Sequence, residues 1–281
     1  MNTWVIARAT FGDALRKRVL LVFLLLAFVM LTLALLLNYF TAREQSTIFK
    51  STQLAIILIF GALISITTAV YLIPTELERR TIYSVLAKPV QRWEFFLGKF
   101  FGGAMTLAVM TGLMTLALML VLFVLSARPP TSAADVSQAQ TQAVVFKDWM
   151  VRGGAEMLLV LRAVVVIYFH LVMVLSIATT FSLFMAPTVN FAVTALIWVL
   201  GQFQDVLFGW AGNGFLQWPV RIFSYFLPHF HDFNIMGSII HPAAMGDFPH
   251  WVFAGGVSLY GCLFSGVVLL IGVLLFDQKE V

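Results

Sequence analysis

The stretch TELERRTIYSVLAKPVQRWEFFLGK, Thr75 to Lys99, is a dense group of charged residues between two long apolar runs. The flanking runs are Leu54–Ile73 and Phe101–Leu125. About 20 consecutive apolar residues suffice for a helix to cross a hydrocarbon core of about 30 Å. Because a charged stretch separates two runs of that length, the chain is predicted to cross a membrane before and after it.

The rest of the chain has the same character. Hydrophobic residues make up 61% of it and charged residues only 11%, against about a quarter charged in soluble domains. Backbone polar groups cannot stay unpaired in lipid, so runs of this length must be helices. We predict an all-α polytopic membrane protein with six transmembrane helices: Val19–Leu37, Leu54–Ile73, Phe101–Leu125, Leu158–Phe184, Thr188–Phe208 and Trp251–Phe276.

The distribution of basic residues predicts the orientation. Lysine and arginine are concentrated in residues 1–18 and 75–99 and are sparser in the segments that would lie on the other side. Cytoplasmic loops carry the excess of basic residues in membrane proteins, so both termini and the stretch 75–99 are predicted to be cytoplasmic. The net charge of +4 then reflects orientation and contact with anionic membrane lipids, and no nucleic-acid partner is expected.

Three segments outside the spans have distinct compositions. Residues 1–18 are predicted to form an interfacial helix, because Trp4, Phe11 and Leu15 fall close to one face. Residues 126–157 begin with a Pro-, Ala- and Ser-rich polar sequence and are expected to form an outer loop. Residues 209–250 are aromatic and interrupted by prolines, which predicts short interfacial or re-entrant helices between the fifth and sixth spans.

Residues 75–99 have their own helix signals. Thr75 and Glu78 form a capping box, in which each side chain can bond a free backbone N–H of the other residue. An apolar stripe follows at Ile82, Val85 and Leu86, and Pro89 ends the helix. Residues 92–99 are predicted as a second helical piece that leads into the third span. The stretch is either a short amphipathic helix at the cytoplasmic face or a solvated loop that is basic only to fix the topology.

The order of residues in this stretch carries a resemblance. An acidic pair, a basic residue, a threonine, an apolar run and the pattern KPV-R-EF--GK are formed by Glu76, Glu78, Arg79, Thr81, Leu86, Lys88, Pro89, Val90, Arg92, Glu94, Phe95, Gly98 and Lys99. The pattern resembles the signature of the permease subunits of ATP-binding-cassette exporters of the ABC-2 type. The opening IARATFGDALRKRVLLVFLLL and the closing LLFDQKEV are similar to the ends of that family, so nearly the whole chain, residues 1–281, fits a single permease domain.

The resemblance implies a division of labour between subunits. Residues 75–99 would contain the coupling helix, which docks on a separate ATPase subunit through Glu76, Glu78, Arg79, Arg80, Thr81, Ile82, Val85, Leu86, Lys88, Pro89 and Arg92. The chain has no G-x-x-x-x-G-K-[ST] phosphate loop, so ATP and Mg are expected on the partner ATPase and no cofactor on this chain. A second permease copy, identical or a sister chain, and a location in the cytoplasmic (inner) membrane are also implied.

Two ionisable residues lie inside the fourth span. Arg162 is close to the outer end, so its side chain is expected to reach the lipid headgroups. His170 is deeper and is predicted to line the translocation route or the seam between two permeases, since ionisable groups inside membrane helices usually mark pathways or pairs.

Small residues at a spacing of four predict close helix contacts. Gly61 and Ser65 in the second span, and Gly98 and Gly102 at the start of the third, have this spacing. They are expected to pack within the chain or to form the seam between two permease copies.

Two other classes of function stay open. A secondary transporter usually shows internal repeats, and no repeat is apparent in this sequence. An intramembrane enzyme needs converging catalytic groups, and the motifs H-E-x-x-H and G-x-S-x-G are absent.

Overall fold

The computed structural model describes residues 3–38, 45–72, 91–126, 142–203, 228, 230–233 and 250–278. These residues form helices and no strands, which confirms the all-α prediction. The elements are α1 (Thr3–Leu15), α2 (Arg18–Asn38), α3 (Gln45–Val70), α6 (Arg92–Ser126), α8 (Gln142–Phe181), α9 (Pro187–Gln202), the short 3-10 helix η1 (Phe230–Phe233) and α13 (His250–Gln278).

Five of the described helices are long and apolar enough to cross a membrane, so the chain is a multi-pass membrane protein. The apolar windows are Arg18–Leu35, Phe49–Val70, Arg92–Phe123, Met157–Phe181 and Trp251–Asp277. Helix α9 begins at the predicted fifth span but is described for only 16 residues, and residues 204–208 of that span lie outside the described residues. The count of six spans stays a prediction.

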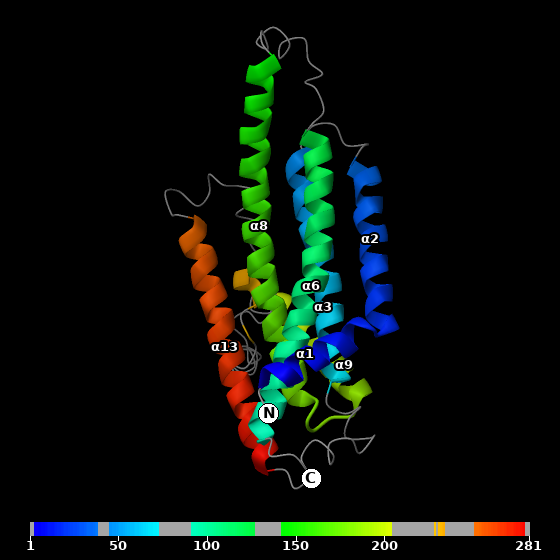
Figure 1. Cartoon of the computed structure of the whole chain (residues 1–281), viewed down its shortest axis with the longest axis vertical. Coiled ribbons are helices and arrows are strands. Elements are labelled where there is room, and N and C mark those ends of the chain that lie inside the picture. The colour runs from blue at the N-terminus through cyan, green and yellow to red at the C-terminus, as the bar shows by residue number, and fades with distance from the viewer. Residues whose placement is uncertain are drawn as a thin grey trace, which may run out of the picture.

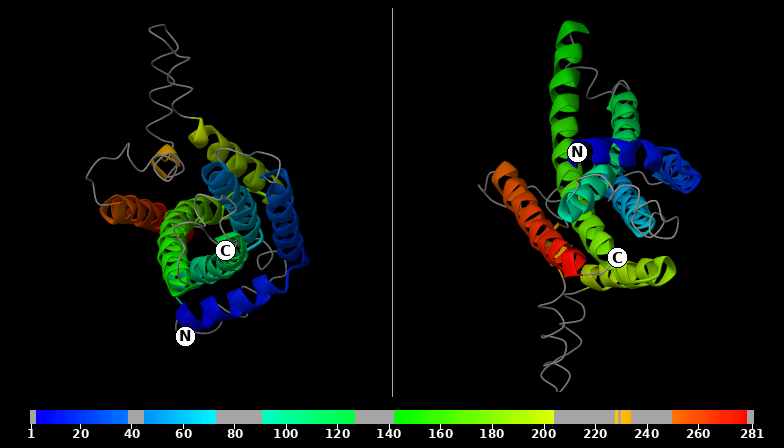
Figure 2. Two further views of the ribbon diagram at one scale, coloured as in Figure 1. Left: turned by 90° about the horizontal axis from the view of Figure 1, so that it is seen from above. Right: turned by 60° about the horizontal axis from the view of Figure 1, so that its bottom comes forward.

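The helices are arranged around α8, which follows the long axis of the molecule (Figure 1). Helices α3 and α6 stand beside α8, with α13 on one side of this group and α2 on the other (Figures 1 and 2). Helix α1 lies across the bundle and meets the base of α2 at a turn, where the Lys17 amide donates to the carbonyl of Ala14 at 3.0 Å. The elbow between α1 and α2 agrees with an N-terminal helix that lies along a membrane surface.

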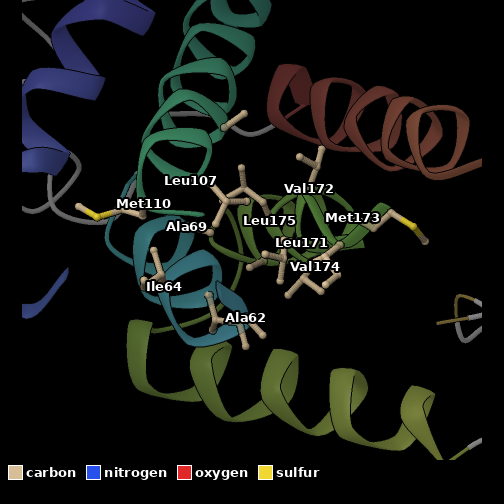
Figure 3. Packing of buried hydrophobic residues seen from close by; sticks show 14 of the residues in the cluster. Ala62, Ile64, Ala69, Leu107, Met110, Leu171, Val172, Met173, Val174 and Leu175 are labelled. Carbon is tan, nitrogen blue, oxygen red and sulfur yellow. The ribbon is translucent and has the colours of Figure 1, made fainter. Parts of the chain in front are cut away.

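The core lies where α3, α6 and α8 meet. Figure 3 shows Leu107 of α6, Ala69 of α3 and Leu175 of α8 gathered between the three helices, and all three side chains are fully buried. Helix α9 lies obliquely beneath α3 and α8 (Figure 3). Helices α2 and α13 leave long rows of apolar side chains exposed, as expected of surfaces that lipid covers.

Polar side chains in this core are bonded mostly to backbone carbonyls. Gln53 joins α3 to α2 by donating to the carbonyl of Leu31 at 3.1 Å. The hydroxyl of Tyr168 joins α8 to α6 through the carbonyl of Ala104 at 3.2 Å. Asn190, fully buried in the first turn of α9, donates to the carbonyl of Ala178 at 2.9 Å and fixes the turn from α8. Such bonds avoid the cost of unpaired polar groups in an apolar interior.

The predicted outer loop 126–157 is wrong from Gln142 onward, because α8 already begins there. The sequence from residue 142 contains no proline and many helix-forming residues, and it continues without a break into the apolar span. The prediction recognised helices by long apolar runs, and this part of α8 has none. A helix outside the membrane does not need such a run. Residues 127–141 of that segment lie outside the described residues.

Candidate functional site

The predicted ATPase-contacting residues fall almost entirely outside the described part of the chain. Glu76, Glu78, Arg79, Arg80, Thr81, Ile82, Val85, Leu86, Lys88 and Pro89 belong to residues 73–90, which the structure does not describe. Helix α3 ends before this segment at Val70, and helix α6 begins after it at Arg92. The coupling helix therefore stays a prediction, and what the structure describes is helix α6, which follows the predicted segment in the chain.

Helix α6 continues without interruption from Arg92 to Ser126. The second predicted helical piece, residues 92–99, is therefore the first part of a membrane helix.

The first turns of α6 are held on one side by the end of α13. The guanidinium Nη1 of Arg92 donates to the backbone carbonyl of Asp277 at 3.4 Å. The rings of Phe95 and Phe96 lie 6.4 and 6.3 Å from the ring of Phe276, measured between centroids, within the range of favourable aromatic pairs. A Cβ added at Gly272 would lie 2.7 Å from Cζ of Phe96. The absence of a side chain at residue 272 thus permits this close approach of α13.

The same turns are held on the other side by α1. A Cβ added at Gly98 would lie 2.8 Å from Cβ of Ile6, and one added at Gly102 would lie 2.7 Å from the backbone oxygen of Ala7. The two glycines thus let the α1 backbone pass directly over α6, as small residues do in membrane helix pairs. This is packing within the chain, one of the two uses expected for these glycines.

The other small residues, in α3, pack against α8. A Cβ added at Gly61 would lie 2.4 Å from Cδ1 of Leu171. The hydroxyl of Ser65 donates to the backbone carbonyl of Leu171 at 3.0 Å. Both residues therefore serve contacts within one chain, and a role at a seam between two permeases has no support from these contacts.

His170 lies at a junction of three elements and is only 1% exposed. The indole N–H of Trp198 in α9 donates to its Nε2 at 3.1 Å, and the amide nitrogen of Gln202 lies 3.3 Å from the same atom. Because an indole nitrogen can only donate, Nε2 is the acceptor and the ring proton is on Nδ1. The His170 ring also stacks on Phe230 of η1 with a centroid distance of 4.7 Å and meets Phe233 edge-on at 5.3 Å.

Two glycines make room for η1 at this junction. A Cβ added at Gly201 in α9 would lie 2.2 Å from Cδ2 of Phe230, and one added at Gly261 in α13 would lie 3.1 Å from Cζ of Phe233. Part of the aromatic segment 209–250 is thus buried between α8, α9 and α13. Sequence reasoning singled out His170 but missed these partners. The aromatic residues of HFHDF, residues 229–233, were the available signal, since apolar rings between two spans favour burial against the bundle.

The comparisons with known proteins bear on the whole chain. Residues 4–281 match the family described as ABC-2 family transporter protein. No curated protein matches the sequence. The match includes the described helices, apart from the first residue of α1, together with the undescribed stretch 73–90 that carries the predicted contact residues. Because the match extends over nearly the full length, the chain belongs to the ABC-2 family of transporter membrane proteins.

Proposed function

We propose that this chain is the permease subunit of an ATP-binding-cassette exporter. The observation that carries the proposal is the family match over residues 4–281. In the proposed arrangement the chain has six spans with both termini in the cytoplasm and lies in the inner membrane. Two permeases, identical or sister chains, enclose the substrate route. Two ATPase subunits, which carry ATP and Mg, bind to them on the cytoplasmic side.

The proposed coupling runs through the start of α6. Residues 75–92 form the docking segment, with the charged first turn on the surface of the ATPase and the apolar residues Ile82, Val85 and Leu86 in its groove. The unbroken path of α6 from Arg92 into the bundle supports this route. Because α1 and α13 pack on the same turns of α6, the three helices are proposed to move as one unit when the ATPases close on ATP.

His170 is proposed to hold the route closed in the state that the structure describes. It lies at the junction of α8, α9 and η1, and its contacts with Trp198 and Phe230 join those three elements. A rearrangement that opens a route beside α8 would have to break some of these contacts, in the manner of a packed interface with two discrete arrangements. Gly61 and Ser65, close against Leu171, are proposed to keep α3 attached to α8 during that change.

The test is co-purification with the ATPase. The full-length permease, tagged and expressed in its native host, is purified in mild detergent, and the co-purifying ATP-binding-cassette ATPase and its ATP hydrolysis are measured. Glu78→Lys reverses a charge in the proposed docking segment and should lower the recovered ATPase about tenfold or more. The amount of permease in the membrane should stay the same.

A matched control makes the same charge change in another helix. Glu156→Lys lies in α8 before its apolar window begins at Met157. Helix α8 begins at the end of the bundle opposite the start of α6 (Figure 1), so this variant should recover as much ATPase as the unaltered chain. Equal recovery with Glu78→Lys and the unaltered chain would refute the docking segment. If no such ATPase accompanies the unaltered chain, the proposed function itself fails.

A further inference from the structure

Arg162 is a largely buried cation near the start of the apolar part of α8. Only 7% of its surface is exposed, and it lies in the apolar window Met157–Phe181 of α8. The expectation that its side chain reaches the lipid headgroups stays a prediction. Its guanidinium carbon lies 5.9 Å from the ring centroid of Trp251, the second residue of α13. Among the described residues, no carboxylate or carbonyl accepts a hydrogen bond from this guanidinium.

Helix α13 also carries hydroxyl groups that have no hydrogen-bond partner among the described residues. Helices α8 and α13 run in the same direction (Figure 1), with Trp251 beside Arg162 and Gly261 beside Phe169, whose Cβ is 3.4 Å from an added Cβ. Ser258 lies between these two contacts along α13. Its hydroxyl oxygen is buried and has no hydrogen-bond partner within the part of the chain that the structure describes.

A second buried hydroxyl group without a partner lies two helical turns beyond Ser258 in α13. The hydroxyl oxygen of Ser265 is buried without a partner among the described residues, and the side chain is 3% exposed. Ser258, Gly261 and Ser265 repeat at the spacing of one helix face. The seam between α8 and α13 thus presents a cation, an indole ring and two hydroxyl groups.

The guanidinium of Arg162 and the two hydroxyl groups can pair with a group from outside the described chain. A guanidinium carries five N–H donors and no acceptor, and a charge removed from water is costly unless it is paired and hydrogen-bonded. An aromatic ring over the guanidinium compensates only part of that cost. The groups that pair best with a guanidinium are planar or tetrahedral oxyanions, namely carboxylates and phosphates, which accept two parallel N–H donors.

We propose that the seam between α8 and α13 is a binding site for an anionic head group of the phosphate or carboxylate class, held by Arg162 and Trp251. Ser258 donates to polar atoms of the ligand that lie further along the seam. The outward face of α13 beside the seam is strongly exposed and apolar at Val252, Leu259 and Leu263. An acyl chain attached to the head group can lie along that face, so an anionic amphiphile fits the site better than a free anion.

The experiment compares lipid and free-anion probes on the full-length chain purified in neutral detergent. Phosphatidylglycerol and phosphatidylcholine with the same acyl chains are added in equal amounts, and the lipids retained per chain are counted by native mass spectrometry. The unaltered chain should retain phosphatidylglycerol about tenfold better than phosphatidylcholine. Inorganic phosphate, added without lipid, tests the free anion by the shift in the thermal unfolding midpoint.

Variants assign the preference to this seam. Arg162→Gln should remove the preference for phosphatidylglycerol, while Arg162→Lys, which keeps the charge but loses the paired donors, should keep part of it. Trp251→Leu should lower the preference several-fold, because the ring no longer lies over the cation. Arg8→Gln removes a charge from the exposed face of α1 and should leave the preference of the unaltered chain in place.

The outcomes separate the sources of the anion. Selective retention of phosphatidylglycerol that depends on Arg162 supports a lipid site, and a phosphate-induced shift that depends on Arg162 supports a small-anion site. If the unaltered chain neither prefers phosphatidylglycerol nor responds to phosphate, the proposal is overturned, whether or not the Arg162 variants fold. It is also overturned if Arg8→Gln loses the preference as fully as Arg162→Gln. Binding is measured without the ATPase, so either result leaves the proposed permease role untouched.

Discussion

Replacing Gly102 with alanine should detach α1 from α6. The added Cβ would lie 2.6 Å from Cβ of Thr10 and 2.7 Å from the backbone oxygen of Ala7, whereas carbon atoms pack best at about 3.5–4.0 Å. Neither atom is the end of a flexible side chain, so relief requires the α1 backbone to move by about 1 Å. Overpacking of this kind costs about 1–3 kcal/mol.

The same substitution elsewhere in α6 provides the control. An added Cβ at Gly112 meets nothing within 4 Å. Alanine is favoured over glycine in a helix interior by about 1 kcal/mol, and this gain applies to both variants. The difference between Gly102→Ala and Gly112→Ala therefore isolates the clash with α1.

The assay is thermal unfolding of the two purified variants in the same detergent. A difference of about 1–3 kcal/mol corresponds to a gap of about 2–12 °C between their midpoints, at about 2–4 °C for each kcal/mol. Amide hydrogen exchange should rise in α1 for Gly102→Ala only, since this variant disrupts the packing of α1 against α6. If the two variants melt together, or if α1 is equally protected in both, the described contact between α1 and α6 is refuted.

Three further predictions concern side-chain hydrogen bonds between helices. His170→Phe leaves the indole N–H of Trp198 without its acceptor and should cost about 1–3 kcal/mol, measured as a lower thermal midpoint; an unchanged midpoint would contradict the network. Asn190→Ala removes the side chain that bonds α9 to the end of α8. It should lower the free energy of unfolding, measured with denaturant, by about 1–3 kcal/mol. A decrease of less than a few tenths of a kcal/mol would count against this bond. Ser65→Ala loses a bond to another helix and should cost about 0.6 kcal/mol, more than Thr68→Ala, whose hydroxyl bonds within its own helix; the reverse order would count against the α3–α8 contact.

The positions of the membrane helices were largely predictable from the sequence. Apolar runs of sufficient length marked the helices α2, α3, α6, α8 and α13, because lipid requires every backbone polar group to be bonded within the segment. The prediction failed at the start of α8, where Gln142 begins a helix in polar sequence. Apolarity marks the part of a helix that lipid surrounds and says nothing about how far the helix continues beyond it.

The partners within the bundle were not predictable, for a physical reason. In a soluble helix the apolar face indicates the buried side, but lipid and protein interior are equally apolar, so this signal vanishes in a membrane. The spacing of Gly98 and Gly102 predicted a close contact without naming α1 as the partner. The ionisable His170 indicated a special position, yet its contacts with Trp198 and Phe230 come from elements far along the chain.

The length of α8 has a practical consequence. The helix has 40 residues and so measures about 60 Å, of which about 22 Å precedes its apolar window at Met157. A straight rod anchored at one end magnifies small rotations at its free tip, where a tilt of about 10° becomes a displacement of about 4 Å. A spectroscopic label near Gln142 would report changes in the tilt of α8 during transport. The label would not have to be placed among the buried residues.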